Sequence, residues 1–169
     1  ALPISNINRY RIREIKNHLN MSTSLHIFVV TTACNVGCVY CQANNGTRCS
    51  GLFMDKETAR RAVDIALESP TKSLTFEFQG GEPLLNFEII KYIVEYSKEA
   101  NKTHSINYTV VSNLTLLTDE MITYFRENNF GVSTSLDGHE FLHNKNRPYK
   151  DGGHTYRDVI KSIDRLREA

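Results

Sequence analysis

The stretch Leu25–Cys41 reads LHIFVVTTACNVGCVYC and joins an apolar run to a group of cysteines. The β-branched residues at its start predict a buried strand. Cys34, Cys38 and Cys41 then follow within eight residues, in the spacing Cys-x3-Cys-x2-Cys. Three neighbouring thiolates can hold an iron–sulfur cluster and leave one iron without a protein ligand. The stretch therefore predicts a strand whose carboxyl end carries a cluster that can also bind a small molecule.

Other uses of cysteine fit this spacing less well. A zinc ribbon uses two separated Cys-x2-Cys pairs, and this chain has one, Cys38 and Cys41. A thioredoxin-like redox pair at those two positions leaves Cys34 unexplained. The chain has only four cysteines and its start resembles no signal peptide, so we expect no disulfides. Cys49 lies outside the motif, and we expect it to be a free or structural thiol.

Length and composition are those of an ordinary globular domain. The chain has 169 residues, of which 40% are hydrophobic and 23% are charged. No apolar run approaches the roughly 18 residues of a membrane-spanning helix. The net charge of +1 gives no reason to expect a nucleic-acid partner or an anionic membrane surface. Free cysteines and an oxygen-sensitive cluster favour the reducing cytoplasm.

The rest of the chain alternates between predicted strands and predicted helices. We expect strands over 25–31, 73–79, 106–112 and 132–137. We expect a first helix over 56–68, capped by Asp55, and a second that is capped by Asn86. A third helix is expected over 118–128, begun by Thr118 or Asp119, and a fourth over 155–168. This alternation predicts an α/β fold of parallel β/α units. A further helix is expected around 10–19.

Polar motifs follow each predicted strand. Gly80-Gly81-Glu82-Pro83 comes after the second strand, Ser112-Asn113 ends the third and Asp137-Gly138 ends the fourth. The carboxyl ends of parallel strands meet on one rim, where such folds place their chemistry. We therefore expect these motifs to lie beside the three cysteines.

With Tyr40 directly before the third cysteine and Gly80-Gly81-Glu82-Pro83 downstream, the chain resembles the radical S-adenosylmethionine (SAM) superfamily over roughly residues 25–156. The resemblance implies a [4Fe-4S] cluster on Cys34, Cys38 and Cys41, with the amino and carboxylate groups of SAM at the open iron. It also implies that reductive cleavage of SAM yields a 5′-deoxyadenosyl radical, which abstracts a hydrogen atom from the substrate.

The resemblance also assigns roles to the other motifs. It places the backbone of Tyr40 near the adenine, and it places Gly80, Gly81 and the carboxylate of Glu82 at the amino group of SAM. The alternative is that Gly80-Gly81-Glu82-Pro83 is only a turn between a strand and a helix, with Glu82 exposed to solvent.

Two further motifs carry expected contacts to SAM. Ser112 and Asn113 match residues that contact the ribose or carboxylate, although Leu114 replaces the usual glycine, so the turn is expected to differ. His143 and Arg147 match a downstream His…Arg element of the family, in which the arginine binds the carboxylate of SAM through its planar fork. A surface loop is the alternative for His139, His143 and Arg147.

Other strand residues admit two interpretations. Thr75, Glu77 and Gln79 alternate with Leu74, Phe76 and Phe78 along the second strand. The apolar set is expected to face the helices and the polar set the lumen of a barrel. Glu77 is equally well interpreted as a structural carboxylate.

The resemblance implies a partial (β/α) barrel with about four of an expected six units. We expect residues 1–20 to form an N-terminal extension and residues 21–169 a radical SAM core domain that is the N-terminal portion of a larger protein. The isolated chain is therefore expected to bind its cofactors better than it modifies a substrate.

The Ser135-Leu136-Asp137-Gly138 segment and the region Phe78–Leu85 most resemble peptide and protein maturases. This branch includes the sulfatase-maturating enzymes and the maturases of the His-Xaa-Ser peptide system. The expected partners are a peptide or protein substrate and a flavodoxin or ferredoxin as electron donor. An RNA or small-molecule substrate, or an electron-transfer module without SAM cleavage, are the alternatives.

Overall fold

The computed structural model describes residues 23–44 and 51–169, together with residues 11, 13 and 14. The expected helix around 10–19 and the thiol of Cys49 lie largely or wholly outside these residues. In the described part of the chain, no helix is long and apolar enough to cross a membrane.

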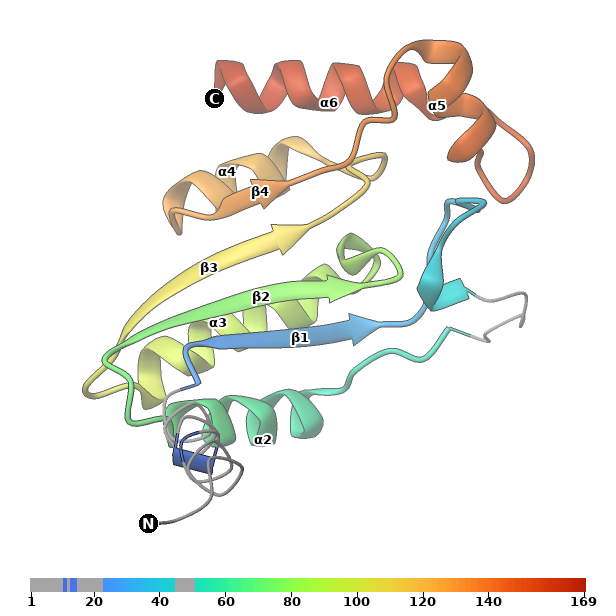
Figure 1. The fold of residues 1–169 in the computed structure, drawn as a ribbon. Coiled ribbons are helices and arrows are strands. Elements are labelled where there is room, and N and C mark those ends of the chain that lie inside the picture. The colour runs from blue at the N-terminus through green and yellow to red at the C-terminus, as the bar shows by residue number, and fades with distance from the viewer. Residues whose placement is uncertain (1–10, 12, 15–22, 45–50) are drawn as a thin grey trace.

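Four parallel strands form one sheet in the order β1-β2-β3-β4 (Figure 1). The strands are β1 (Leu25–Thr31), β2 (Ser73–Gly80), β3 (Ser105–Val111) and β4 (Gly131–Ser133). The α-helices are α2 (Lys56–Leu67), α3 (Phe87–Ala100), α4 (Asp119–Glu127), α5 (Glu140–Asn146) and α6 (Tyr156–Glu168). Two 3-10 helices, η1 (Gln42–Asn44) and η2 (Pro83–Asn86), follow the first two strands. The result is the expected α/β architecture, a partial (β/α) barrel of four units.

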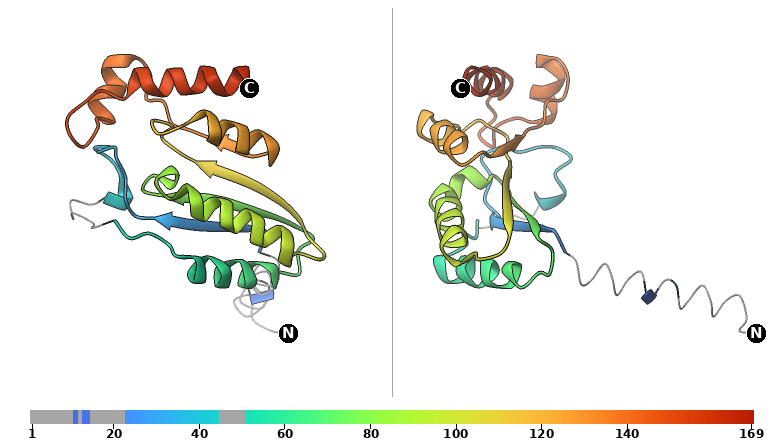
Figure 2. Two further views of the ribbon diagram at one scale, coloured as in Figure 1. Left: turned by 180° about the vertical axis from the view of Figure 1, so that it is seen from behind. Right: turned by 90° about the vertical axis from the view of Figure 1, so that its left-hand side faces the viewer.

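Helices α2, α3 and α4 cover one face of the sheet (Figure 2). The apolar set of β2, Leu74, Phe76 and Phe78, is fully buried against this layer, as the alternation predicts. Fully burying such a side chain contributes about 1.5–3 kcal/mol, so this face supplies the core. The opposite face of β1 carries Leu25, Ile27 and Val29, which are about half exposed.

Helix capping agrees with the sequence at two positions and differs at one. The Asp55 carboxylate accepts a hydrogen bond from the Thr58 amide (2.8 Å), and the Thr118 hydroxyl accepts one from Met121 (3.2 Å). Asn86 occupies the N-cap position of α3, but its side chain makes no capping bond. Its amide instead donates to the carbonyls of Val30 (2.8 Å) and Met54 (3.1 Å). Asn86 therefore ties the end of β1 to the segment before α2.

The fourth strand is shorter than predicted. It ends at Ser133 instead of Asp137, because β3 offers partners only along Thr109–Val111. Beyond that point the Asp137 amide donates to Nδ1 of His143 (3.3 Å) instead of joining the sheet. The alternative of a surface loop is wrong for His143, since residues 140–146 form α5 and His143 is fully buried.

Candidate functional site

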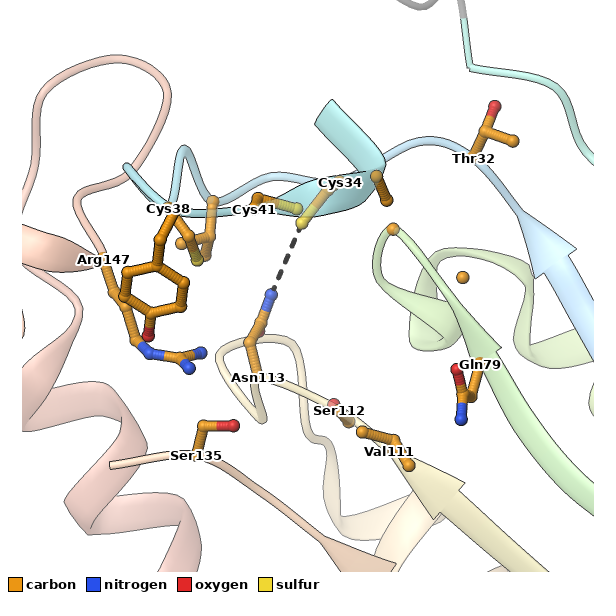
Figure 3. A pocket seen from close by; sticks show the side chains of 15 residues that line it. Thr32, Cys34, Cys38, Cys41, Gln79, Val111, Ser112, Asn113, Ser135 and Arg147 are labelled. Atoms are coloured by element: carbon orange, nitrogen blue, oxygen red, sulfur yellow. Dashed lines mark hydrogen bonds between the residues drawn. The ribbon is translucent and has the colours of Figure 1, made fainter. Parts of the chain in front are cut away.

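One pocket at the carboxyl rim of the sheet collects the predicted site residues (Figure 3). All of them line it except Glu82. The lining residues are Thr32, Cys34, Val36, Cys38, Tyr40, Cys41, Ala43, Gln79, Gly80, Gly81, Val111, Ser112, Asn113, Ser135 and Arg147. These residues come from the ends of all four strands, and Arg147 follows α5, so the parallel topology assembles the site as expected.

The cysteine loop is held from outside by the segment after α5. The amides of Gly37 and Val39 donate to the carbonyls of Pro148 (2.8 Å) and Asn146 (2.9 Å), and Lys150 donates back to Asn35 (3.1 Å). These backbone bonds fix the loop without using its side chains. The three thiols therefore remain available as ligands.

Cys34, Cys38 and Cys41 are all free and partly buried. Burial raises the pKa of the Cys34 and Cys38 thiols, and the Arg147 guanidinium partly offsets this effect at Cys38. The Asn113 amide nitrogen lies 3.9 Å from Sγ of Cys34, within hydrogen-bonding reach of a sulfur. Cluster potentials depend on such donors, so Asn113 is placed to tune a bound cluster.

The three cysteines fit a cluster. In a [4Fe-4S] cluster each thiolate binds a different iron, and Cys34, Cys38 and Cys41 all line one pocket as free thiols. Within the described residues, no group of three His, Cys, Asp or Glu side chains suited to a single metal ion is found.

Gly80 and Gly81 allow the end of β2 to contact the backbone that leads into the cysteine loop. A Cβ on Gly81 would lie 2.2 Å from the Ala33 carbonyl oxygen, and one on Gly80 would lie 2.3 Å from that of Thr31. The Gly81 amide donates to the Thr31 carbonyl at 2.9 Å. The glycines therefore permit a close approach of two backbones, in addition to lining the pocket.

Glu82 is fully buried and does not line the pocket, and both of its carboxylate oxygens accept hydrogen bonds. Oε1 accepts from the Ser112 hydroxyl (2.8 Å) and the Leu84 amide (3.1 Å), while Oε2 accepts from the Asn113 amide (2.8 Å). Burial raises the pKa of this carboxyl group, although these hydrogen bonds oppose the shift. Glu82 is therefore not a solvated residue of a turn: it joins the end of β2 to the end of β3. Its expected contact with a SAM ammonium stays a prediction.

The turn after β3 keeps a left-handed residue although its glycine is replaced. Leu114 has a φ of 62° and is fully buried. The expectation that leucine changes this turn is wrong, because burial of the side chain offsets the strain of a positive φ. The Asn113 side chain is held in turn by contacts to Asn35 (3.1 Å) and Thr115 (2.7 Å).

Arg147 reaches the pocket from the end of α5 and is oriented by Asp137. Its Nε donates to Oδ1 of Asp137 at 2.9 Å, and its guanidinium lies 5.3 Å from the centre of the Tyr40 ring. Figure 3 shows the two terminal nitrogens directed toward Asn113 across the pocket. A guanidinium held through Nε keeps these nitrogens available to a planar anion such as a carboxylate.

Some lining residues escaped the sequence analysis as site residues. Gln79 was expected only in the lumen and Ser135 only as part of the Ser135–Gly138 segment, while the apolar Val36 and Val111 gave no signal. Ser135 follows β4 and Gln79 directly precedes Gly80, so their nearness to rim motifs was the available signal. His139, by contrast, is exposed and does not line the pocket.

The sequence matches the family model described as Radical SAM superfamily over residues 28–169. The protein MJ0907 of Methanocaldococcus jannaschii is 36% identical over 81% of this chain and 46% of that protein. A serine-type anaerobic sulfatase-maturating enzyme of Bacteroides thetaiotaomicron is 31% identical over 82% of this chain and 35% of that enzyme.

Solved structures give the same result. Native anSMEcpe with bound AdoMet (SAM) superposes with a TM-score of 0.78 and 29% identity, over 86% of this chain and 41% of that one. The chain thus spans less than half the length of the relatives it matches. The family match over most of the chain, together with the shared fold, establishes that this chain belongs to the radical SAM superfamily, whose cofactors are SAM and a [4Fe-4S] cluster.

Proposed function

We propose that Cys34, Cys38 and Cys41 hold a [4Fe-4S] cluster, that SAM binds beside it, and that the resulting enzyme modifies a peptide or protein. The observation that supports this most strongly is the single pocket in which the three free thiols face the polar ends of β2 and β3. A site of soft thiolates next to hydrogen-bonding groups and one arginine suits a cluster with an amino-acid-like ligand.

When bound, the cluster and SAM supply reductive cleavage of SAM to methionine and a 5′-deoxyadenosyl radical. The role of the chain's own residues is to bind and orient the cluster and SAM. Arg147 would bind the SAM carboxylate through its terminal nitrogens, and the backbone at Gly80 and Gly81 would bind the SAM amino group; the presence of all three residues in one pocket wall supports these roles. Ser112 and Asn113 would provide polar contacts to bound SAM, and the backbone near Tyr40 would lie beside its adenine. The apolar Val36 and Val111 exclude water from part of the pocket wall.

Relatives favour a peptide or protein as the substrate. Several are named as sulfatase-maturating enzymes, and one solved neighbour is anSMEcpe with bound AdoMet and the Cp18Cys peptide. The Ser135–Gly138 segment also resembles that of this branch, and its Asp137 accepts a hydrogen bond from Arg147. A low-potential flavodoxin or ferredoxin is the proposed electron donor. An RNA substrate gains no support from the net charge of +1.

The test is anoxic reconstitution of the chain with iron and sulfide, followed by SAM and dithionite. We expect 5′-deoxyadenosine and methionine to form in equal amounts, and a variant lacking all three cysteines to form neither. A reconstituted chain that carries electrons but neither binds nor cleaves SAM would support an electron-transfer module instead. Incubation with candidate precursor peptides, followed by mass spectrometry, distinguishes a peptide substrate from other classes.

A further inference from the structure

Two polar side chains stand next to each other on the face of β2 that is turned away from the helices. The Gln79 amide nitrogen donates to Oε1 of Glu77 at 2.5 Å, and the Thr109 hydroxyl lies 3.4 Å from Oε2. Gln79 lines the pocket, whereas Glu77 lies one step further from the rim and does not. Glu77 therefore contacts a pocket residue without being part of the pocket wall.

The chemistry of this pair fixes the orientation of the Gln79 carboxamide. An ionised carboxylate accepts hydrogen bonds and donates none, while a carboxamide has one donating and one accepting end. Because Glu77 takes the donating nitrogen, the oxygen of Gln79 is left for the other side. In Figure 3 this oxygen lies on the side nearer the cysteines and the nitrogen on the far side.

The residues around Glu77 do not compete with Gln79 for its carboxylate. On the neighbouring strand Ile27 pairs with Glu77 and Val29 with Gln79, so β1 offers only apolar side chains at both positions. Within the described residues, no lysine or arginine forms an ion pair with Glu77. Gln79 is thus the main hydrogen-bond donor to this carboxylate, and Thr109 a distant second.

We infer that Glu77 is a positioning residue that holds the Gln79 carboxamide with its oxygen toward the pocket, where that oxygen accepts a hydrogen bond from a donor group of bound SAM. The inference rests on the proposed binding of SAM in this pocket. SAM offers an ammonium group, ribose hydroxyls and an adenine amino group as donors. If the Gln79 carboxamide rotated freely, its NH2 group would face the pocket part of the time and would repel the donor groups of SAM.

The test is a double-mutant cycle on SAM affinity, measured by anoxic equilibrium dialysis with the reconstituted, unreduced chain, so that no turnover is needed. Glu77→Met keeps an unbranched side chain of similar length but removes the acceptor, and we expect SAM affinity to fall about fivefold. Glu77→Gln can hold the carboxamide in either orientation, so its affinity should lie between those of the wild type and Glu77→Met. Thr75→Val, on the same strand and face, is the matched control and should leave SAM affinity unchanged.

The second arm of the cycle uses Gln79→Leu. This substitution alone should weaken SAM about as much as Glu77→Met, and adding Glu77→Met to it should change affinity by less than about twofold. Iron content should match the wild type in every variant. The inference would be overturned if Glu77→Met lowered SAM affinity equally in the wild type and in Gln79→Leu, or if it lowered SAM affinity in neither. The binding of SAM by the wild type would be unaffected by either result. A wild-type chain with four irons and no SAM binding would overturn the proposed function itself.

Discussion

Tyr40 and Asp137 are joined by a hydrogen bond of 2.6 Å from the tyrosine hydroxyl to Oδ2 of the carboxylate. This bond connects the cysteine loop to the segment after β4, which lies 97 residues away in the chain. The other oxygen of Asp137 accepts from Arg147 at 2.9 Å. Partial burial alone would raise the pKa of Asp137, but the hydrogen bonds from Tyr40 and Arg147 outweigh it and lower the pKa. Asp137 therefore stays ionised while it orients Arg147.

We expect Asp137→Asn to weaken SAM binding about fivefold without loss of the cluster, because Arg147 loses its ionic partner and the orientation of its planar group. The control is Tyr40→Phe, which removes one hydrogen bond to Asp137 but leaves the bond from Arg147. SAM affinity by anoxic calorimetry and iron content are the two measurements. An equal loss of affinity in both variants would mean that the orientation of Arg147 is not what matters.

Leu114 gives a prediction about stability. Leu114→Ala should destabilise the chain by about 2–5 kcal/mol, because it removes a fully buried side chain. Leu114→Gly removes one more carbon atom of the buried side chain than Leu114→Ala does. At a φ of 62°, however, glycine avoids the backbone strain that alanine retains. We therefore expect the glycine variant to be the more stable of the two by about 1 kcal/mol. Urea unfolding of both variants checks the order, and a more stable alanine variant would contradict this account of the turn.

Glu82 gives a prediction about pH. Its folded pKa is raised by burial from the ordinary value of 4.5. Its contribution to stability is thus fully present below about pH 4.5 and is lost as the pH rises through the raised folded value. The side chain of the Glu82→Gln variant does not titrate, so the variant does not lose this stability. The unfolding free energy of the variant minus that of the wild type should therefore increase as the pH is raised from 4 to 8, as measured by urea titrations. A difference that stays constant with pH would show that Glu82 does not titrate in this range.

The same variant tests the expected contact with SAM. If the Glu82 carboxylate also binds the SAM ammonium, Glu82→Gln should lower SAM affinity roughly ten- to hundredfold with the cluster retained, as for loss of a charge-assisted hydrogen bond. If the carboxylate only joins β2 to β3, stability should change and SAM affinity should change little.

Features set by local periodicity could be predicted from the sequence. The buried set Ala59, Val63 and Ala66 recurs at helical spacing, and α2 lies within one residue of the expected bounds. The three cysteines and the glycine pair could be placed on one rim because parallel strands leave no other arrangement. The topology and most of the pocket therefore follow from residue order.

Features set by contacts between distant residues could not be predicted. Helix α5 has seven residues, and its Phe141 is 75% exposed, so it lacks an apolar stripe. It is fixed instead by the buried His143, whose Nε2 lies 3.1 Å from the Thr155 hydroxyl. The burial of Glu82 likewise depends on donors 30 residues away at Ser112. No pattern within either segment reports these partners.

The central claim is that Cys34, Cys38 and Cys41 together hold one [4Fe-4S] cluster. The most direct measurement is iron and sulfide content, with electron paramagnetic resonance of the dithionite-reduced chain before and after addition of SAM, for the wild type and for the Cys34→Ala, Cys38→Ala, Cys41→Ala triple variant. We predict about four irons and four sulfides per wild-type chain, a signal that SAM changes, and neither iron nor signal in the triple variant. A triple variant that keeps about four irons per chain, or a wild-type signal that SAM leaves unaltered, would contradict the account.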